Sequence, residues 1–259
     1  LASRKWAITL MATVGVTLST FMIGGAVWAT AALIGLNLPF LWALVFGALI
    51  SPTDPVAVLG LFRTVKVPAS LEAKVAGESL FNDGVGVVVF TVVVAIAISS
   101  SGNSEVLSVR DVAQIFVKEA LGGAALGLIA GYIGYRAMYQ VDEYNLEILI
   151  SLAVVMLSYS AAITLHMSGP IAVVIAGLLI GNRGVKYAMS ETTRSYLTRF
   201  WTLLDEVLNS VLFLLIGLEV VVVTGGIGNS WPLALLAIPI TLGARFFSVS
   251  IPVLMLSRS

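Results

Sequence analysis

Long apolar runs dominate this chain, and short polar stretches separate them. Eight runs approach or exceed the length of about 20 residues that a helix needs to cross a bilayer. The predicted spans cover residues 6–34, 39–62, 75–98, 112–135, 146–165, 168–182, 200–223 and 231–256. Because the connections are short, neighbouring spans are predicted to be antiparallel and packed together. The pattern therefore predicts an all-α, polytopic membrane protein.

The composition agrees with this class and excludes several others. The chain of 259 residues is 59% hydrophobic and 11% charged, which a soluble domain of this size does not need. Its net charge is zero and it has no basic tract, so no nucleic-acid partner is expected. Without cysteine and with a single histidine, His166, it cannot build thiolate or histidine-cluster metal sites. We expect no cofactor and no enzymatic activity.

The distribution of Lys and Arg predicts the orientation in the membrane. With the residue 1 end in the cytoplasm, eleven of fourteen basic residues fall on the inner side and two on the outer side. The inner residues are Arg4, Lys5, Arg63, Lys66, Lys74, Arg136, Arg183, Lys186, Arg194, Arg199 and Arg258. A re-entrant sixth segment would remove this asymmetry, so residues 168–182 are predicted to cross. The chain starts without Met and stops just after a span, so we expect an internal piece of a longer protein.

Acidic side chains interrupt two of the apolar runs. Asp54 lies within the sequence SPTDP at 51–55, and Glu78 and Asp83 lie within ESLFND at 78–83. A carboxylate in a bilayer costs about 2.5–3.5 kcal/mol on insertion scales. Three carboxylates this close together are therefore predicted to handle a cation or protons.

Two prolines predict a break in the second span. Each proline lacks an N–H donor and disfavours helical dihedral angles at the residue before it, so Pro52 and Pro55 should displace Ser51 and Asp54. Alternatively, Asp54 caps a new helix that has Pro55 at its first position. Residues 39–50 alone would span only about 18 Å, so the break is predicted to lie inside the membrane. Secondary transporters hold ions at such breaks.

The third span gathers oxygen-bearing side chains on one side. Ser79 and Asp83 are four residues apart, as are Glu78 and Asn82, and such pairs share a helical face. Hard ions prefer oxygen ligands. Asp83 can bind either a cation or a proton but not both, which is the minimal requirement of an exchanger. We predict a monovalent cation at Asp83 and Asp54.

Arg245 lies in the middle of the last span. A guanidinium group keeps its charge in proteins, so an arginine inside a membrane needs a partner. Glu78 is the first choice and Asp83 the second, although Arg245 lies deeper than Glu78 and the pairing needs tilt or a long reach. In the fourth span, glycines at 122, 123, 127, 131 and 134 predict a packing face.

These motifs resemble those of the monovalent cation:proton antiporter 1 family, which includes NhaP-type proteins and sodium/proton exchangers. The resemblance rests on GALISPTDPVAV at 47–58, GESLFNDG at 77–84, NSVLFLLIGLE at 209–219 and GAR at 243–245. It implies an inverted-repeat fold with a broken crossing helix, of which this chain would hold about eight of thirteen spans. It also implies a homodimer for the full-length protein.

The resemblance also implies roles for individual residues. Thr53 would help to form the crossing and offer an oxygen atom, and Asp54 would assist coordination. Asp83 would carry the ion and the proton, with Ser79 as a ligand and Asn82 beside it. Glu78 and Arg245 would form a structural ion pair. Asparagine at position 82, where a second aspartate could stand, resembles the electroneutral branch of the wider superfamily.

The predicted function is exchange of a monovalent cation, sodium first and potassium second, for a proton by alternating access. A bacterial inner membrane is the expected location. A cation channel is an alternative, but no filter sequence is visible. An intramembrane aspartyl protease would need Asp54 and Asp83 as a catalytic dyad, and its Gly-x-Gly-Asp pattern is absent.

Overall fold

The computed structural model describes residues 11–52, 65, 67–101, 108–184, 189–224 and 230–257. Every regular element in these residues is helical and none is a β-strand, so the all-α prediction is confirmed. Six helical stretches in this part are long and apolar enough to cross a membrane, and two shorter apolar helices cover Phe40–Ile50 and Gly169–Asn182. The architecture is that of a polytopic helical membrane protein. The bounds and crossings of the eight spans remain predictions.

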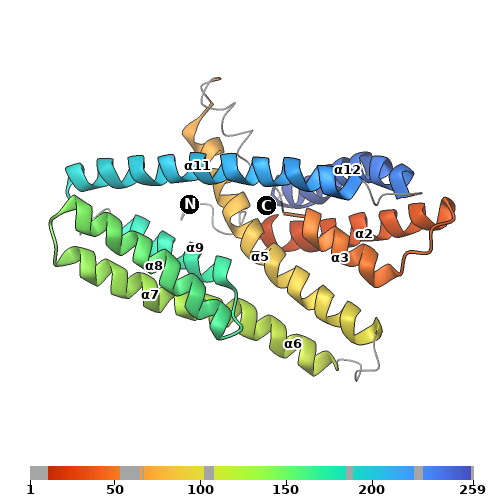
Figure 1. Ribbon diagram of the computed structural model, residues 1–259, viewed down its shortest axis with the longest axis horizontal. Coiled ribbons are helices and arrows are strands. Elements are labelled where there is room, and N and C mark those ends of the chain that lie inside the picture. The colour runs from red at the N-terminus through yellow and green to blue at the C-terminus, as the bar shows by residue number, and fades with distance from the viewer. Residues whose placement is uncertain are drawn as a thin grey trace. The chain divides into compact units, whose positions relative to one another are not determined.

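The chain divides into two compact units (Figure 1). Unit 1 comprises Leu1–Gly122 and Pro232–Ser259, and unit 2 comprises Gly123–Trp231. The described helices up to Gly122 are η2 (Met11–Gly15), α2 (Val16–Leu33), α3 (Phe40–Ile50), α5 (Ala69–Ser101), α6 (Val109–Val117) and η3 (Lys118–Gly122). The later ones are α7 (Gly123–Tyr139), α8 (Tyr144–Thr164), α9 (Gly169–Leu179), η4 (Ile180–Gly184), α11 (Glu191–Thr224) and α12 (Trp231–Ser257). All but the first residue of α12 belongs to unit 1.

Close contact between α2 and α3 organises unit 1. A Cβ atom added at Gly24 would lie 2.9 Å from the Cα atom of Leu44, and one added at Gly47 would overlap the carbonyl oxygen of Thr20. These two glycines therefore allow α2 and α3 to approach more closely than any side chain at either position would permit. Beside this contact, Ile23 and Val27 of α2 form a buried cluster with Ala244 of α12.

Helix α3 ends at Ile50, two residues before Pro52, as the pair of prolines predicts. The prediction that Pro52 displaces Ser51 from helical geometry is wrong, because Ser51 keeps φ −65° and ψ −40°. Its backbone N–H still donates to the carbonyl of Gly47 at 3.0 Å, and its hydroxyl donates to the same oxygen at 2.7 Å. These bonds offset the steric preference that a following proline imposes.

In unit 2 the predicted glycine face of α7 packs against α9. Added Cβ atoms at Gly123, Gly127 and Gly131 would meet the backbone of Ser168, Ala172 and Ala176, respectively. Each step of four residues along α7 is matched by a step of four along α9, so the two helices run in the same direction. The packing role predicted for these three glycines is confirmed.

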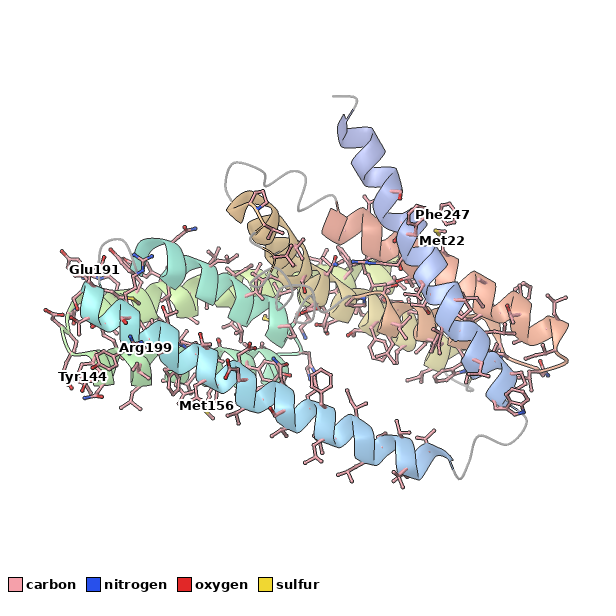
Figure 2. All side chains as sticks on the ribbon, turned by 90° about the horizontal axis from the view of Figure 1, so that it is seen from above. Met22, Tyr144, Met156, Glu191, Arg199 and Phe247 are labelled. Atoms are coloured by element: carbon pink, nitrogen blue, oxygen red, sulfur yellow. The ribbon has the colours of Figure 1, made fainter. Side chains whose placement is uncertain are left out.

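Helices α8 and α11 also run in the same direction. Tyr144 and Tyr196 stack with ring centroids 4.5 Å apart, and the indole N–H of Trp201 donates to Ser151 at 3.2 Å. Figure 2 shows Tyr144 and Glu191, near the starts of these helices, at the same end of unit 2. A re-entrant segment at 168–182 would make α8 and α11 antiparallel. If residues 168–182 cross the membrane, α7 and α9 must be parallel, and so must α8 and α11. The structure has both parallel pairs.

Candidate ion-binding site

Ser51 is the meeting point of three helices in unit 1. Its side chain is buried, with 1% exposure, and its hydroxyl accepts a hydrogen bond from Thr20 of α2 at 3.1 Å. Its backbone carbonyl accepts from Nη1 of Arg245 of α12 at 3.2 Å. The last carbonyls of a helix lack partners within the helix and carry partial negative charge. Arg245 therefore places its positive charge at the C-terminal end of α3, where the chain was predicted to break.

The contact between Arg245 and Ser51 adds a backbone partner that the sequence did not indicate. Glu78, the predicted ionic partner of Arg245, belongs to α5, but its side chain lies outside the described residues. The ion pair between Glu78 and Arg245 therefore remains a prediction.

Pro52 brings the end of α3 against α5. A Cβ atom added at Gly86 would overlap the Cγ atom of Pro52. Gly86 lies about one helical turn beyond Asn82 and Asp83, so the start of the predicted break packs beside the acidic turn of α5. Thr53 and Asp54 follow Pro52 and lie outside the described residues.

Three predicted site residues on α5 differ in exposure. Ser79 is 7% exposed and Asn82 is 0% exposed, whereas Asp83 is exposed. The Asn82 side chain has buried Oδ1 and Nδ2 atoms, and neither has a hydrogen-bond partner within the described part of the chain. An unsatisfied buried polar group costs about 1–3 kcal/mol. A polar ligand beside Asn82 would remove this cost. A role in packing alone would not explain a buried amide at this position.

The described side chains contain no cluster of three or more His, Asp or Glu residues that could hold a metal ion. The predicted ligands are of a different kind, because they combine hydroxyl and amide oxygens with the carboxylates of Asp83 and Asp54. A set with few charged ligands suits a monovalent cation. A single titratable carrier also lets a proton compete for the same position.

The sequence interpretation did not single out Glu147, a buried acid on α8. Its first-turn position in an apolar run is typical of an interfacial carboxylate beside the helix N-terminus. Its hydrogen-bond donor, Thr193 of α11, is 46 residues away. No local pattern reveals that contact.

Comparison with known proteins assigns the family. The sequence profile described as "Sodium/hydrogen exchanger, transmembrane" matches residues 1–257. The chain therefore belongs to the sodium/hydrogen exchanger family, and the suspected family resemblance is confirmed. Members of this family are transporters and not enzymes, as expected.

Individual relatives carry the same family name. The chain is 48% identical over 219 residues to the Na(+)/H(+) antiporter NhaP of Pseudomonas aeruginosa, covering 85% of this chain and 51% of the relative. It is 35% identical over 249 residues to the Na(+)/H(+) antiporter NhaH of Halobacillus dabanensis, covering 96% and 60%. It is 36% identical over 220 residues to ApNhaP of Aphanothece halophytica, covering 84% and 40%. The chain thus spans about half the length of these relatives.

Replacing Arg245 tests its role at the end of α3. We expect Arg245→Ala to lower thermal stability, because the mutation removes a charged donor from the Ser51 carbonyl, a bond worth about 1.5–3 kcal/mol. Arg245→Lys should recover part of the loss, since it keeps the charge but not the planar group. Arg110→Ala, an exposed arginine of unit 1, is the control. Wild-type stability in Arg245→Ala would refute the structural role.

Proposed function

We propose that the full-length protein exchanges a monovalent cation, with sodium as the first choice, for a proton across a membrane. The contact of Pro52 with Gly86 carries this proposal, because it sets the end of α3 beside the acidic turn of α5. The relatives, which are named as sodium/proton antiporters, support the same substrates.

The mechanism that we propose is alternating access. Asp83, assisted by Asp54, binds a cation from one side, and a proton displaces the cation on the other side. Thr53, Ser79 and Asn82 supply neutral oxygen atoms. The described members of this set, Ser79, Asn82 and Asp83, belong with Arg245 to unit 1, which supports a site within a single compact unit.

Competition for one carboxylate also favours exchange over the alternatives. A channel needs a continuous pore and a filter, and the family assignment does not favour one. An exchanger needs only a carboxylate that binds the cation in one half-cycle and the proton in the other. With Asn82 in place of a second acid, the proposed exchange is one cation for one proton and moves no net charge.

Location, orientation and assembly complete the proposal. The bacterial relatives support a bacterial inner membrane. The distribution of basic residues supports a cytoplasmic residue 1 end. A homodimer of the full-length protein follows only from the family resemblance.

The test is cation-induced dequenching of a pH-sensitive dye in vesicles that contain the full-length protein. We expect an immediate response to sodium, a weaker one to potassium, and no change when the membrane potential is clamped at different values. A response that scales with membrane potential would contradict electroneutral exchange. No response to either cation from folded protein would contradict the proposed substrates.

A further inference from the structure

A second acidic group lies in unit 2, away from the residues of the predicted ion site. Glu147, on the first turn of α8, has 0% exposure. Its Oε1 atom accepts a hydrogen bond from the hydroxyl of Thr193 at 3.2 Å. Thr193 is itself 1% exposed, and its hydroxyl accepts from Ser190 at 3.2 Å. The carboxyl group thus ends a chain of hydroxyls that begins at the N-terminus of α11.

The other carboxyl oxygen of Glu147 determines which form of the group is stable. Oε2 is buried and has no hydrogen-bond partner among the described residues. An ionised carboxylate buried in this way costs far more than a neutral acid with one unsatisfied polar atom. A neutral hydroxyl donor on Oε1 stabilises either form but does not balance a full negative charge. The geometry favours the protonated acid.

The charged side chains on the surrounding elements do not neutralise Glu147. Arg194 pairs with Glu191 at 3.9 Å, and both side chains are more than half exposed. The charged groups described on the packed elements are all exposed, namely Arg136, Asp142, Glu143, Glu191, Arg194, Arg199, Asp205, Glu206 and Glu219. Asp142 and Glu143 are nearest along the chain and are negative, so they disfavour a second negative charge. Arg183 and Lys186 lie outside the described side chains.

We propose that Glu147 and Thr193 form a proton-binding site in unit 2 that is separate from the transported-ion site. The site holds its proton at pH values at which an exposed glutamate has lost it, and releases that proton as the pH rises further. Under the predicted orientation, α8 and α11 both begin on the cytoplasmic side, so the site would respond to cytoplasmic pH. Its ligand is the proton alone, because the described residues offer no further charged or carboxyl ligand for a metal ion.

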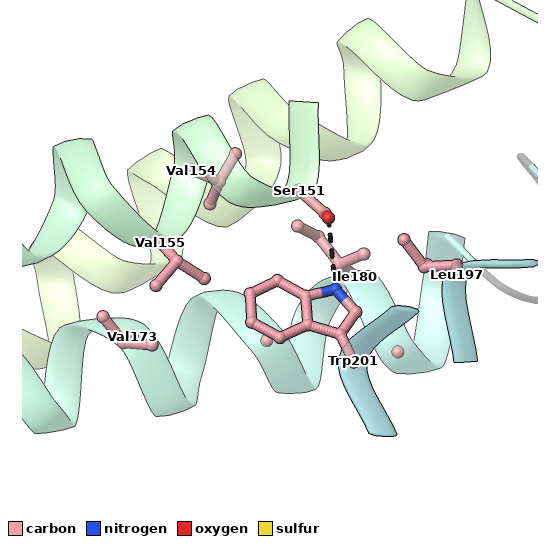
Figure 3. Close-up of a pocket in the computed structure, with 9 residues that line it drawn as sticks. Ser151, Val154, Val155, Val173, Ile180, Leu197 and Trp201 are labelled. Atoms are coloured by element: carbon pink, nitrogen blue, oxygen red, sulfur yellow. Dashed lines mark hydrogen bonds between the residues drawn. The ribbon is translucent and has the colours of Figure 1, made fainter. Parts of the chain in front are cut away.

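Release of the proton weakens the contact between α8 and α11. One turn beyond Glu147, the Trp201 indole donates to Ser151 beside an apolar cavity of about 300 Å³ (Figure 3). Valines 154 and 155, Leu197 and Ile180 contribute to its walls. A negative charge at Glu147 draws water into the contact between α8 and α11. The neighbouring cavity is largely apolar, so its walls offer that water few hydrogen-bond partners. The two helices therefore separate more readily once the proton has been released.

Infrared difference spectroscopy of the full-length protein tests the charge state without requiring transport. We expect Glu147→Gln to remove a protonated-carboxyl C=O band from the wild-type spectrum at neutral pH. The matched control is Glu143→Gln, an exposed acid four residues earlier, which should remove a carboxylate band and leave the C=O band in place. Loss of a carboxylate band in Glu147→Gln at neutral pH would overturn the proposal.

Two further measurements address folding and coupling. Thr193→Val keeps the carboxyl group but removes its donor, so the C=O band should move to higher frequency; an unchanged band would contradict the contact. Thermal stability of the wild type should fall as the pH rises above the range in which an exposed glutamate ionises, and Glu147→Gln should lose this dependence. The same pH dependence in both proteins would also overturn the proposal. Neither outcome bears on cation exchange, so this proposal and the proposed function fail independently.

Discussion

Asp83→Asn is expected to abolish cation–proton exchange in the full-length protein while leaving it folded. Asparagine keeps the shape of the side chain but can neither balance the charge of a cation nor carry a proton. Loss of one charged ligand, at about 1.5–3 kcal/mol, weakens cation binding by about 10- to 150-fold. Loss of the proton carrier stops the return step as well, so the exchange rate should fall by at least about 100-fold.

The measurement compares dye dequenching with thermal stability in the same preparation. Asp205→Asn is the matched control, because Asp205 is also an exposed aspartate on an apolar helix but belongs to unit 2. We expect the control to keep wild-type exchange. Exchange retained in Asp83→Asn would remove Asp83 from its proposed role and with it the proposed mechanism.

Gly86→Ala is expected to impair exchange through the position of Pro52. The added methyl group would overlap the Cγ atom of the proline ring, which cannot rotate away as a flexible chain end can. Overpacking of this kind costs about 1–3 kcal/mol and moves the end of α3 away from the acidic turn of α5. We expect an exchange rate at least about tenfold lower, a higher apparent KM for the cation and a lower thermal stability.

The control for Gly86→Ala is Gly243→Ala on α12. Apart from the adjacent residues and the backbone of α12 itself, no described atom lies within 4 Å of a Cβ placed at Gly243, so that substitution adds a methyl group without a clash. Alanine also favours a helix over glycine by about 1 kcal/mol, so this variant should be as stable as the wild type or more stable. Equal exchange in the two alanine variants would show that the contact between Pro52 and Gly86 does not position the site.

Hydropathy located the helical segments better than it located their ends. Helix α5 begins at Ala69 and α11 at Glu191, six and nine residues before the predicted spans at 75–98 and 200–223. The early turns of both helices contain polar and charged residues, which continue a helix but not an apolar run. The end of α3 was predictable because two prolines follow in close succession, whereas the single Pro239 does not end α12.

The candidate site was predictable in its residue types and less so in its contacts. An acid inside an apolar run is visible in the sequence, as at Asp83 and Asp54. The partner of Arg245 at the end of α3 is a backbone carbonyl, which every residue has, so no side-chain pattern marks Ser51. The contact of Gly86 with Pro52 joins residues 34 positions apart and depends on how the helices pack.

The parallel pairing of α7 with α9 has a consequence for biogenesis. As the chain leaves the ribosome, the glycine face of α7 is complete two helices before its partner backbone at Ser168–Ala176 exists. Until α9 is inserted, that face can contact only lipid or the antiparallel α8, and neither fills the groove that the glycines leave. Premature termination between Thr164 and Ser168 should therefore leave an inserted but unassembled unit 2, a natural substrate for membrane quality control.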